Sequence, residues 1–571
     1  MKSYFSISVC LGTLVARCLA VTVTVSKTAS HSVPSTLYGQ MFEVHTTAAL
    51  TAWHPINNAK LVVIADPNPV SNALPNSLQF SVPSGATGQV GFSNEGFWGI
   101  NVNSSWTYNA SFFFRFPTAS GFSGALTVGL QTSSGKVLAQ TSTQVHGSTT
   151  KWTQVNLKLR PTASASDVNN SFFVTIDGAA AAGQTINFAL FSLFPPTFKN
   201  RPNGMRIDIA ETLAEMGPAF FRFPGGNNLF FEDVGMEPIM AVWAGYSLGG
   251  TSLAENQLAP YIQQAKDQIN FVIGNPAESA PAALRASLGH PEPFQLRFVE
   301  VGNEDFFAAN TYTYRWNDFV SALQAEFPQI RFIATTDAWD PILSPVPQSY
   351  DVHVYQTPTW FFQNAFYYDD FQRNGTTYFE GEYAAISTNA NDIFGTPADG
   401  RLTFPTMQSA SGEAAFMTGL ERNSDIVFAA SYAPLLQHVN STQWLLLCPD
   451  PGFDLIRLFS LNRGDQYLPS TLPTRGDTLH WSITRSSSSG QTFIKVANAG
   501  SSAESITFQL NQFGSVASAG TLQLLTGAET ASNTPDAPET IVPKTSTIRT
   551  GKSFTYDAPA FSVSVITVTT H

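Results

Sequence analysis

The sequence predicts a (β/α)8 barrel with an inserted β-sandwich and a C-terminal β-sandwich. Eight short apolar segments between residues 39 and 432 can form barrel strands, and helical patterns alternate with strand patterns after residue 197. Residues 57–196 alternate polar and apolar side chains in short runs that Gly, Ser, Asn and Pro separate. The same all-β pattern returns from residue 461 to the end of the chain.

The first twenty residues have the pattern of a secretory signal. Lys2 precedes an apolar stretch over residues 5–16, and small residues close the segment before Val21. No later segment is apolar over a length that could cross a bilayer, so we expect a secreted, extracellular protein without a membrane partner. Five Asn-x-Ser/Thr sequons fit a glycosylated surface. They begin at Asn103, Asn109, Asn169, Asn374 and Asn440.

The balance of charges limits which classes of binding partner are expected. The chain has 41 Asp and Glu residues against 29 Lys and Arg residues, which argues against a nucleic acid or an anionic membrane. Charged residues make up only 12% of the chain, so its surface is expected to be rich in neutral polar groups, as suits a neutral polysaccharide substrate. Of three cysteines, only Cys448 follows the signal, so no disulfide is expected.

Domain boundaries follow from these patterns. Residues 21–38 begin with a period-two strand, which we expect to join the C-terminal sandwich of residues 461–571 and to pair with its last strand, over 561–568. The barrel takes residues 39–56 and 197–460, divided by the sandwich of 57–196. A helix is expected from Met205 to Met216, where Gly217 and Pro218 end it.

The expected barrel strands cover eight ranges: 39–43, 219–223, 237–243, 295–301, 331–336, 350–355, 378–382 and 426–432. One connection is too short. Only 13 residues separate Phe223 from Glu237, and a Pro-Gly-Gly-Asn-Asn loop takes part of them. A parallel crossover with its helix needs about a dozen residues at least. Either the second helix is a stub, or residues have been lost from the chain.

Two of these strands deliver a carboxylate at the end where catalytic groups of barrels lie. Glu304 and Glu382 are 78 positions apart (382 − 304), a spacing that suits the fourth and seventh strands. Two carboxylates about 5 Å apart perform retaining glycoside hydrolysis, one as proton donor and one as nucleophile. The alternative for each acid alone is a solvated or helix-capping side chain, since such short segments also occur by chance.

Further polar and aromatic residues have competing interpretations. Residues two apart on a strand share a face, so Glu300 and Glu380 are expected inside the barrel, below the catalytic pair, as structural carboxylates. His353 either keeps the nucleophile ionised or is a core histidine. In the inserted sandwich, Trp98, Trp106 and Trp152 are either a platform on which sugar rings stack or ordinary aromatics of the core and rim.

Four motifs carry a family resemblance. They span residues 221–229 (FRFPGGNNL), 236–246 (MEPIMAVWAGY), 301–304 (VGNE) and 381–384 (GEYA), and the second is highly specific. Together they resemble the fungal α-L-arabinofuranosidases of glycoside hydrolase family 51. The resemblance implies a retaining (β/α)8 barrel, a carbohydrate-binding-module-like sandwich inserted after the first strand and a C-terminal sandwich, with no metal or organic cofactor.

The resemblance also implies residue roles. Glu304 corresponds to the general acid/base and Glu382 to the nucleophile. Five other residues fall where the family contacts the arabinofuranosyl ring: Glu43, Asn227, Asn303, Tyr355 and Gln443. The implied activity is removal of terminal α-L-arabinofuranosyl groups from arabinoxylan or arabinan. The alternatives are a non-catalytic carbohydrate-binding relic and a retaining β-xylosidase or β-glucanase, which share such strand-end acids.

Three places depart from the family pattern. Segments that the family usually carries after Glu43 and Leu229 are missing here, and the sequence after Trp444 differs from the family. The first two gaps affect the rim of the barrel and the second helix. A mispredicted gene and a true divergence would look alike in one sequence. We expect the catalytic acids to be present but folding or activity to be impaired.

Overall fold

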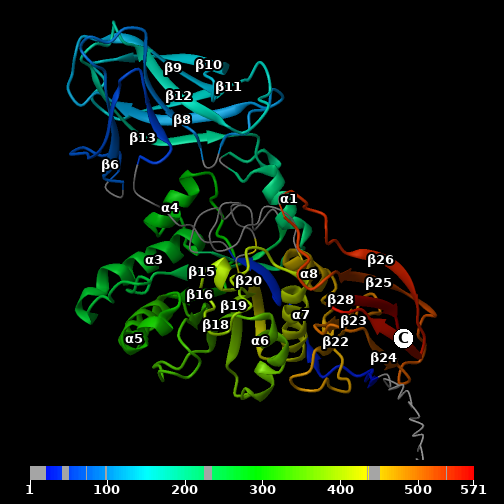
Figure 1. Ribbon diagram of the computed structural model, residues 1–571. Helices are drawn as coiled ribbons and strands as arrows, with labels where there is room; N and C mark the ends of the chain where they lie inside the picture. Colours follow the sequence, from blue (N-terminus) through cyan, green and yellow to red (C-terminus); the bar gives the residue numbers. More distant parts are fainter. Residues whose placement is uncertain are drawn as a thin grey trace, which may run out of the picture. The chain divides into compact units, whose positions relative to one another are not determined.

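The computed structural model describes residues 21–41, 50–71, 74–96, 99–202, 204–223, 234–433, 435, 451–534 and 536–571. The chain forms two compact units (Figure 1). One unit comprises Met1–Glu43 and Leu213–His571, and the other comprises Val44–Thr212. No helix in the described ranges has the length and apolar character that a membrane crossing requires.

The second unit is a sandwich of two five-stranded antiparallel sheets, ordered β10-β9-β12-β7-β4 and β11-β8-β13-β6-β5. Alternation in the sequence produces it: along β8 (Tyr108–Arg115), Phe112 and Phe114 face a core that also holds Phe92 and Phe188. The other strands are β4 (Trp53–Ile56), β5 (Lys60–Ala65), β6 (Asn76–Ser81), β7 (Gln89–Asn94), β9 (Ser123–Thr132), β10 (Val137–His146), β11 (Thr153–Leu159), β12 (Asn170–Asp177) and β13 (Thr185–Phe194).

The first unit contains a closed parallel barrel in the order β14-β15-β16-β17-β18-β19-β20-β3, which confirms the eight predicted strands. In chain order from β3, the fourth strand is β16 and the seventh is β19. The bounds are β3 (Tyr38–Met41), β14 (Phe220–Phe223), β15 (Glu237–Val242), β16 (Phe298–Val301), β17 (Arg331–Ala334), β18 (Ser349–Gln356), β19 (Thr377–Ala385) and β20 (Val427–Tyr432).

Apolar residues from six strands fill the interior of the barrel. They are Phe220, Ile239, Phe298, Ile333, Phe379 and Phe428, with Ala429 beside them. Successive side chains on a strand point to opposite sides, so this layer defines which residues face inward. Arg222 and Glu300 lie two residues beyond Phe220 and Phe298, and they therefore continue the inward face toward the carboxyl ends of the strands.

Seven helices are described: α1 (Ile207–Glu215), α3 (Ala259–Ile273), α4 (Ala280–Ser287), α5 (Ala309–Glu326), α6 (Pro358–Gln363), α7 (Met407–Arg422) and α8 (Pro451–Leu461). Short 3-10 turns are η1 (Phe198–Asn200), η2 (Glu255–Gln257), η3 (Asp305–Ala308), η4 (Tyr367–Asp370) and η5 (Pro397–Asp399). Residues 335–348, between β17 and β18, contain no helix. The prediction about the second helix falls on residues 224–233, which lie outside the described residues.

The C-terminal sandwich packs on the barrel through α7. Its larger sheet has the order β2-β21-β22-β23-β28-β25-β26, and its smaller sheet has the order β1-β24-β27. The bounds are β1 (Val21–Thr24), β2 (His31–Ser32), β21 (Gln466–Tyr467), β22 (Leu479–Arg485), β23 (Gln491–Asn498), β24 (Glu504–Gln509), β25 (Ala519–Thr526), β26 (Lys544–Arg549), β27 (Ser553–Ala558) and β28 (Ser562–Thr569).

The expected pairing of the first strand with the last is wrong. Strand β28 has β23 on one edge and β25 on the other, so neither edge is free. Strand β1 instead lies parallel to β24 in the smaller sheet.

Helix α7 is buried along almost its whole length because small residues allow close approach on several sides. A Cβ at Gly412 would lie 2.5 Å from the Pro358 carbonyl oxygen, and one at Gly419 would lie 2.1 Å from that of Ala365. On the side of the C-terminal sandwich, Glu421 pairs with Lys495 of β23, and both side chains are completely buried. Tyr38 and Ser482 donate hydrogen bonds to the same carboxylate, at 3.0 and 2.6 Å.

Candidate active site

Glu304 lies in a strained turn at the carboxyl end of β16. Its backbone adopts the left-handed conformation (φ 53°, ψ 38°), which is uncommon for a residue with a side chain and recurs at functional sites. Gly302 has a φ of +103°, and a Cβ there would lie 1.8 Å from Oδ2 of Asp305. The Val-Gly-Asn-Glu motif therefore needs its glycine for this turn to form.

A buried aspartate holds the turn. Asp305 Oδ2 accepts hydrogen bonds from the backbone N–H of Asn303 at 3.1 Å and from Thr335 Oγ1 at 2.7 Å. Its other oxygen pairs with the guanidinium of Arg315, which is buried in α5. Asp305 thereby connects the acid-bearing turn to β17 and α5, so the position of Glu304 is fixed by buried neighbours.

Glu382 points to the same side of the barrel because β19 contains a bulge. Val352 pairs with Glu380 and His353 pairs with Glu382, which leaves Gly381 as the extra residue. A Cβ on Gly381 would lie 2.0 Å from Oδ1 of Asp351, so this position accommodates only glycine.

The Glu382 carboxylate is nearly buried and has two donors. Oε1 accepts a hydrogen bond from Arg222 at 2.8 Å, and Oε2 accepts one from the Tyr355 hydroxyl at 2.5 Å. The side chain of Glu382 is 6% exposed, against 16% for Glu304. The guanidinium and the phenol orient the Glu382 carboxylate, and Glu304 is the more accessible of the two.

His353 bridges the two acids. Its Nδ1 lies 3.2 Å from Oε1 of Glu304 and 3.6 Å from Oε2 of Glu382, and its Nε2 lies 2.7 Å from Oδ2 of Asp351. Burial lowers the pKa of His353, but the carboxylates around it raise that pKa more, to well above its usual value. The imidazole is thus expected to be a cation that donates from both nitrogens.

The two acids lie close together. One carboxylate oxygen of Glu304, one of Glu382 and a ring nitrogen of His353 all lie within 4.8 Å of one another. These side chains are also a group that could ligate a metal ion. Ligation needs a neutral imidazole, however, and the raised pKa of His353 opposes that form. The arrangement suits the sharing of protons between the three groups better than it suits a metal.

Arg222 and Asp351 are residues of the candidate site that were not predicted from the sequence. Besides Glu382, Arg222 contacts Glu300 through Nε at 2.8 Å and the Asn303 side-chain oxygen at 2.5 Å. This second contact directs the Asn303 amide so that its NH2 is the group turned away from Arg222. Arg222 is the one charged residue of the buried strand β14, and this signal could have identified it, whereas Asp351 lies in β18 among other polar residues.

Asp351 and Glu300 form a pair of buried carboxyl groups beneath the site. Burial raises the pKa of Asp351, but His353 and Arg222 have the larger, opposite effect and bring that pKa to about 2. Burial raises the pKa of Glu300 well above its usual value, and Glu300 shares a hydrogen bond with Asp351. Glu300 is therefore the carboxyl of the pair that favours its neutral form.

The structure confirms the inward position predicted for Glu300, and the inward position predicted for Glu380 is wrong. Glu300 faces the interior and bonds Arg222. Glu380 follows the inward-facing Phe379 and points to the opposite side, where the Tyr368 hydroxyl of η4 donates to it. The bulge at Gly381 breaks the two-residue periodicity, so Glu380 and Glu382 do not share a face. Burial raises the pKa of Glu380 to about 8.

The predicted ring-contacting residues divide into two groups. Asn303 and Tyr355 lie beside the acids, as described above. Glu43, Asn227 and Gln443 lie outside the described residues.

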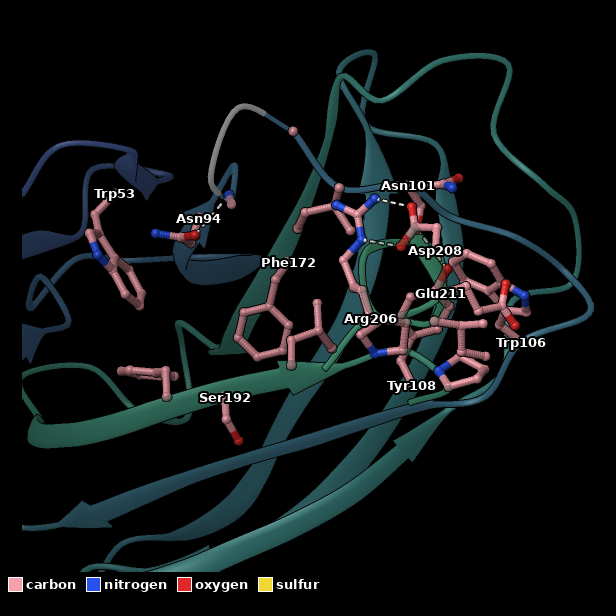
Figure 2. A pocket seen from close by; sticks show the side chains of 18 residues that line it. Trp53, Asn94, Asn101, Trp106, Tyr108, Phe172, Ser192, Arg206, Asp208 and Glu211 are labelled. Carbon is pink, nitrogen blue, oxygen red and sulfur yellow. Dashed lines mark hydrogen bonds and ion pairs between the residues drawn. The ribbon is translucent and has the colours of Figure 1, made fainter. Parts of the chain in front are cut away.

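The predicted tryptophan platform is not formed by Trp106 and Trp152, while Trp98 lies outside the described residues. The two residues lie at opposite ends of β8. Trp106 comes just before this strand, whereas Trp152 packs against Arg115 at its last position, where the guanidinium carbon lies 5.4 Å from the centroid of the indole ring. Trp106 instead lines a cavity of about 880 Å³ within the sandwich unit (Figure 2). Other lining residues include Trp53, Asn94, Phe172, Phe191, Arg206 and Asp208.

Known proteins match the chain over most of its length. Residues 229–373 match the family model described as α-L-arabinofuranosidase 1 domain, and residues 381–562 match the α-L-arabinofuranosidase C-terminal domain. Probable α-L-arabinofuranosidase A of Aspergillus flavus is 32% identical, over 94% of this chain and 92% of its own. The chain belongs to the α-L-arabinofuranosidases. α-L-arabinofuranosidase A of Aspergillus kawachii is 31% identical over the same shares.

Solved structures place this arabinofuranosidase in glycoside hydrolase family 51. The arabinose-bound structure of MgGH51 α-L-arabinofuranosidase is 72% identical, covers 96% of this chain and 100% of its own, and superposes with a TM-score of 0.90. The Thermotoga maritima α-L-arabinofuranosidase, 18% identical with a TM-score of 0.53, covers 65% of this chain and 91% of its own. It shares the fold. The family resemblance and the fold class predicted from the motifs are thereby confirmed.

The alignments also bear on the missing segments. The match to the Aspergillus flavus relative extends over 604 positions, more than the 571 residues of this chain. The relative therefore carries residues that this chain lacks.

Proposed function

We propose that the protein is a retaining exo-α-L-arabinofuranosidase that releases terminal arabinofuranosyl groups. The observation that carries this proposal is the approach of Glu304 and Glu382, from the fourth and seventh strands, to within 4.8 Å between carboxylate oxygens. Retaining glycosidases have carboxyl groups about 5–5.5 Å apart, whereas inverting ones need about 6.5–9.5 Å to admit water.

In the first step, Glu382 attacks the anomeric carbon while Glu304 protonates the departing glycosidic oxygen. The nucleophile must be an anion, and Arg222 and Tyr355 support that form by donating to its two oxygens. The step forms the bond from Glu382 to the sugar, breaks the glycosidic bond and moves the proton of Glu304 to the leaving group.

In the second step, Glu304 removes a proton from water, and the water attacks the anomeric carbon. Glu304 gave up its proton in the first step, so it is the carboxylate that can accept the proton of the water. His353 stays within 3.2 Å of Glu304, and its cationic form supports the ionised acid/base at this stage.

Asn303 is proposed to donate to the 2-hydroxyl of the sugar. Arg222 holds the oxygen of the Asn303 amide, which leaves the NH2 as the donor. Hydrogen bonds to this hydroxyl strengthen as positive charge develops on the sugar ring in the transition state. Glu43, Asn227 and Gln443 are proposed as further contacts on the grounds of the family motifs alone. No metal or cofactor takes part in the proposed reaction.

The proposed substrates are polysaccharides with arabinofuranosyl side groups, such as arabinoxylan and arabinan. The names of the relatives support this class, because both the Aspergillus enzymes and MgGH51 are described as α-L-arabinofuranosidases. Secretion and glycosylation are proposed from the N-terminal signal pattern and the sequons. The exposed positions of Asn109, Asn169 and Asn374 support glycosylation.

Hydrolysis of 4-nitrophenyl α-L-arabinofuranoside, beside the β-xyloside and β-glucoside, tests the proposal. We expect cleavage of the arabinofuranoside, and NMR of the first product should show the same anomeric configuration as the substrate. Preference for a β-glycoside would assign another substrate, and inversion would refute the mechanism. Loss of all three activities would favour the carbohydrate-binding relic, provided that the chain is folded.

We also propose that the chain as written is impaired relative to an intact family member. The alignment with the Aspergillus flavus relative is longer than this chain, which supports a loss of residues. Sequencing the transcript tests this: coding residues after Glu43 or Leu229 would establish an error in the predicted gene. Expression of the written sequence as a monodisperse, fully active enzyme would contradict the impairment.

A further inference from the structure

Two large apolar side chains are exposed on loops beside the site. Phe307 in η3 is 64% exposed, and Phe394, in the loop between β19 and α7, is 71% exposed. These two loops follow the strands that carry Glu304 and Glu382. Phenylalanine is normally buried, and binding residues of a barrel lie on the loops at the carboxyl ends of its strands.

A short chain of contacts connects Phe307 to both acids. Its ring centroid lies 4.6 Å from that of Phe306, and the Phe306 ring lies 6.3 Å from the imidazole of His353. That imidazole in turn contacts Glu304 and Glu382. Phe307 is therefore separated from the reacting groups by one aromatic ring and the histidine.

Phe394 is connected to the nucleophile in the same manner. Its ring lies 6.2 Å from that of Tyr355, whose hydroxyl donates to Glu382. On the other side, the Arg401 guanidinium lies 5.4 Å from the Phe394 ring centroid and donates to the Ile393 carbonyl oxygen at 2.9 Å.

Phe394 is exposed on a loop that hydrogen bonds hold in place. The backbone N–H of Thr388 donates to the carbonyl oxygen of Gly400 at 2.9 Å, and the Asn389 amide donates to that of Asp399 at 2.9 Å. These bonds close the loop at its base. A preorganised exposed ring loses little conformational freedom when a ligand covers it, which favours binding.

We propose that Phe307 and Phe394 bind the sugar ring that carries the arabinofuranosyl group. This inference rests on the proposed function, in which Glu304 protonates the leaving oxygen. The sugar attached to that oxygen must then lie beside Glu304, where Phe307 follows in the same turn. The C–H faces of sugar rings are apolar and pack on phenyl rings, so a bound neutral sugar would bury the two exposed side chains. The two phenylalanines thereby favour substrates whose leaving group is a sugar.

The test compares a polymer with a substrate that has no sugar as leaving group. We expect Phe307→Ala and Phe394→Ala each to lower kcat/KM for arabinoxylan, relative to kcat/KM for α-L-arabinofuranosyl fluoride, by about tenfold. Phe307→Trp should restore the ratio, because it restores an aromatic face. Leu288→Ala is the matched control. Leu288 is also 71% exposed, but it follows α4 and precedes β16 instead of lying on the loop after a strand that carries an acid, so the ratio should not change.

Several outcomes overturn the proposal. An unchanged ratio in both alanine variants would show that the rings do not contact the leaving sugar, and an equal loss on both substrates would place them at the arabinofuranosyl ring. A change of oligomeric state with an unchanged ratio would assign the rings to a contact between copies of the chain. Failure of the unsubstituted enzyme to hydrolyse the fluoride contradicts the proposed function itself, so the two failures are distinguishable.

Discussion

Replacement of Lys495 by methionine is expected to destabilise the first unit strongly. Lys495 and Glu421 are both fully buried. Among the described residues, Lys495 is the only basic side chain that bonds the Glu421 carboxylate, whose other donors are Tyr38 and Ser482. Lys495→Met keeps the length and apolar contacts of the side chain but leaves the Glu421 carboxylate buried without a cation. Removing one partner of a buried ion pair costs about 3–5 kcal/mol, so we expect this loss in the free energy of unfolding.

A second substitution supplies the internal control. Glu421→Gln replaces the carboxylate with a neutral amide, whose oxygen can still accept from Tyr38 and Ser482. We therefore expect Lys495→Met with Glu421→Gln to be more stable than Lys495→Met alone, although Glu421→Gln alone is destabilising. Urea unfolding, followed by circular dichroism and by residual activity, measures the three variants. If the two substitutions were additive, the carboxylate would not be the source of the loss, and this reasoning would be refuted.

Two further predictions concern titrating groups. Glu380 has a pKa of about 8 in the folded chain and about 4.5 in the unfolded chain, so between these pH values only the folded chain keeps this proton. The contribution of Glu380 to the free energy of unfolding therefore falls by about 1.4 kcal/mol for each unit by which the pH rises in this range. Glu380→Gln should remove this fall, and parallel stability curves for both proteins would contradict it. Asp351→Asn should lower the pKa of His353, which titration of the imidazole by NMR measures; an unchanged pKa of His353 would show that Asp351 does not hold the proton.

The sequence predicts the barrel well because its strands are short apolar segments between clear turn signals. Their order then follows from the chain, since neighbouring parallel strands of a barrel are consecutive. This is why β16 and β19 can be assigned as fourth and seventh, with their carboxyl ends at one rim. The directions of the Glu304 and Glu382 side chains depend in addition on the turn at Gly302 and the bulge at Gly381.

The failures have physical causes that local pattern does not carry. The bulge at Gly381 moves Glu380 to the outer side, and its signal is the clash that a Cβ would make with Asp351, a residue far away in sequence. The partner of β1 depends on which edges the other strands of the sandwich leave free.

The assignment of Glu382 as nucleophile and Glu304 as acid/base is tested most directly by azide rescue of their alanine variants, with the configuration of the product determined by NMR. In Glu382→Ala, azide replaces the nucleophile, so the account predicts a β-L-arabinofuranosyl azide from an α-linked aryl substrate with a good leaving group. In Glu304→Ala, azide attacks the sugar bound to Glu382, and the account predicts the α-azide. The reverse pattern, or rescue by azide of Glu380→Ala in place of Glu382→Ala, would contradict the assignment.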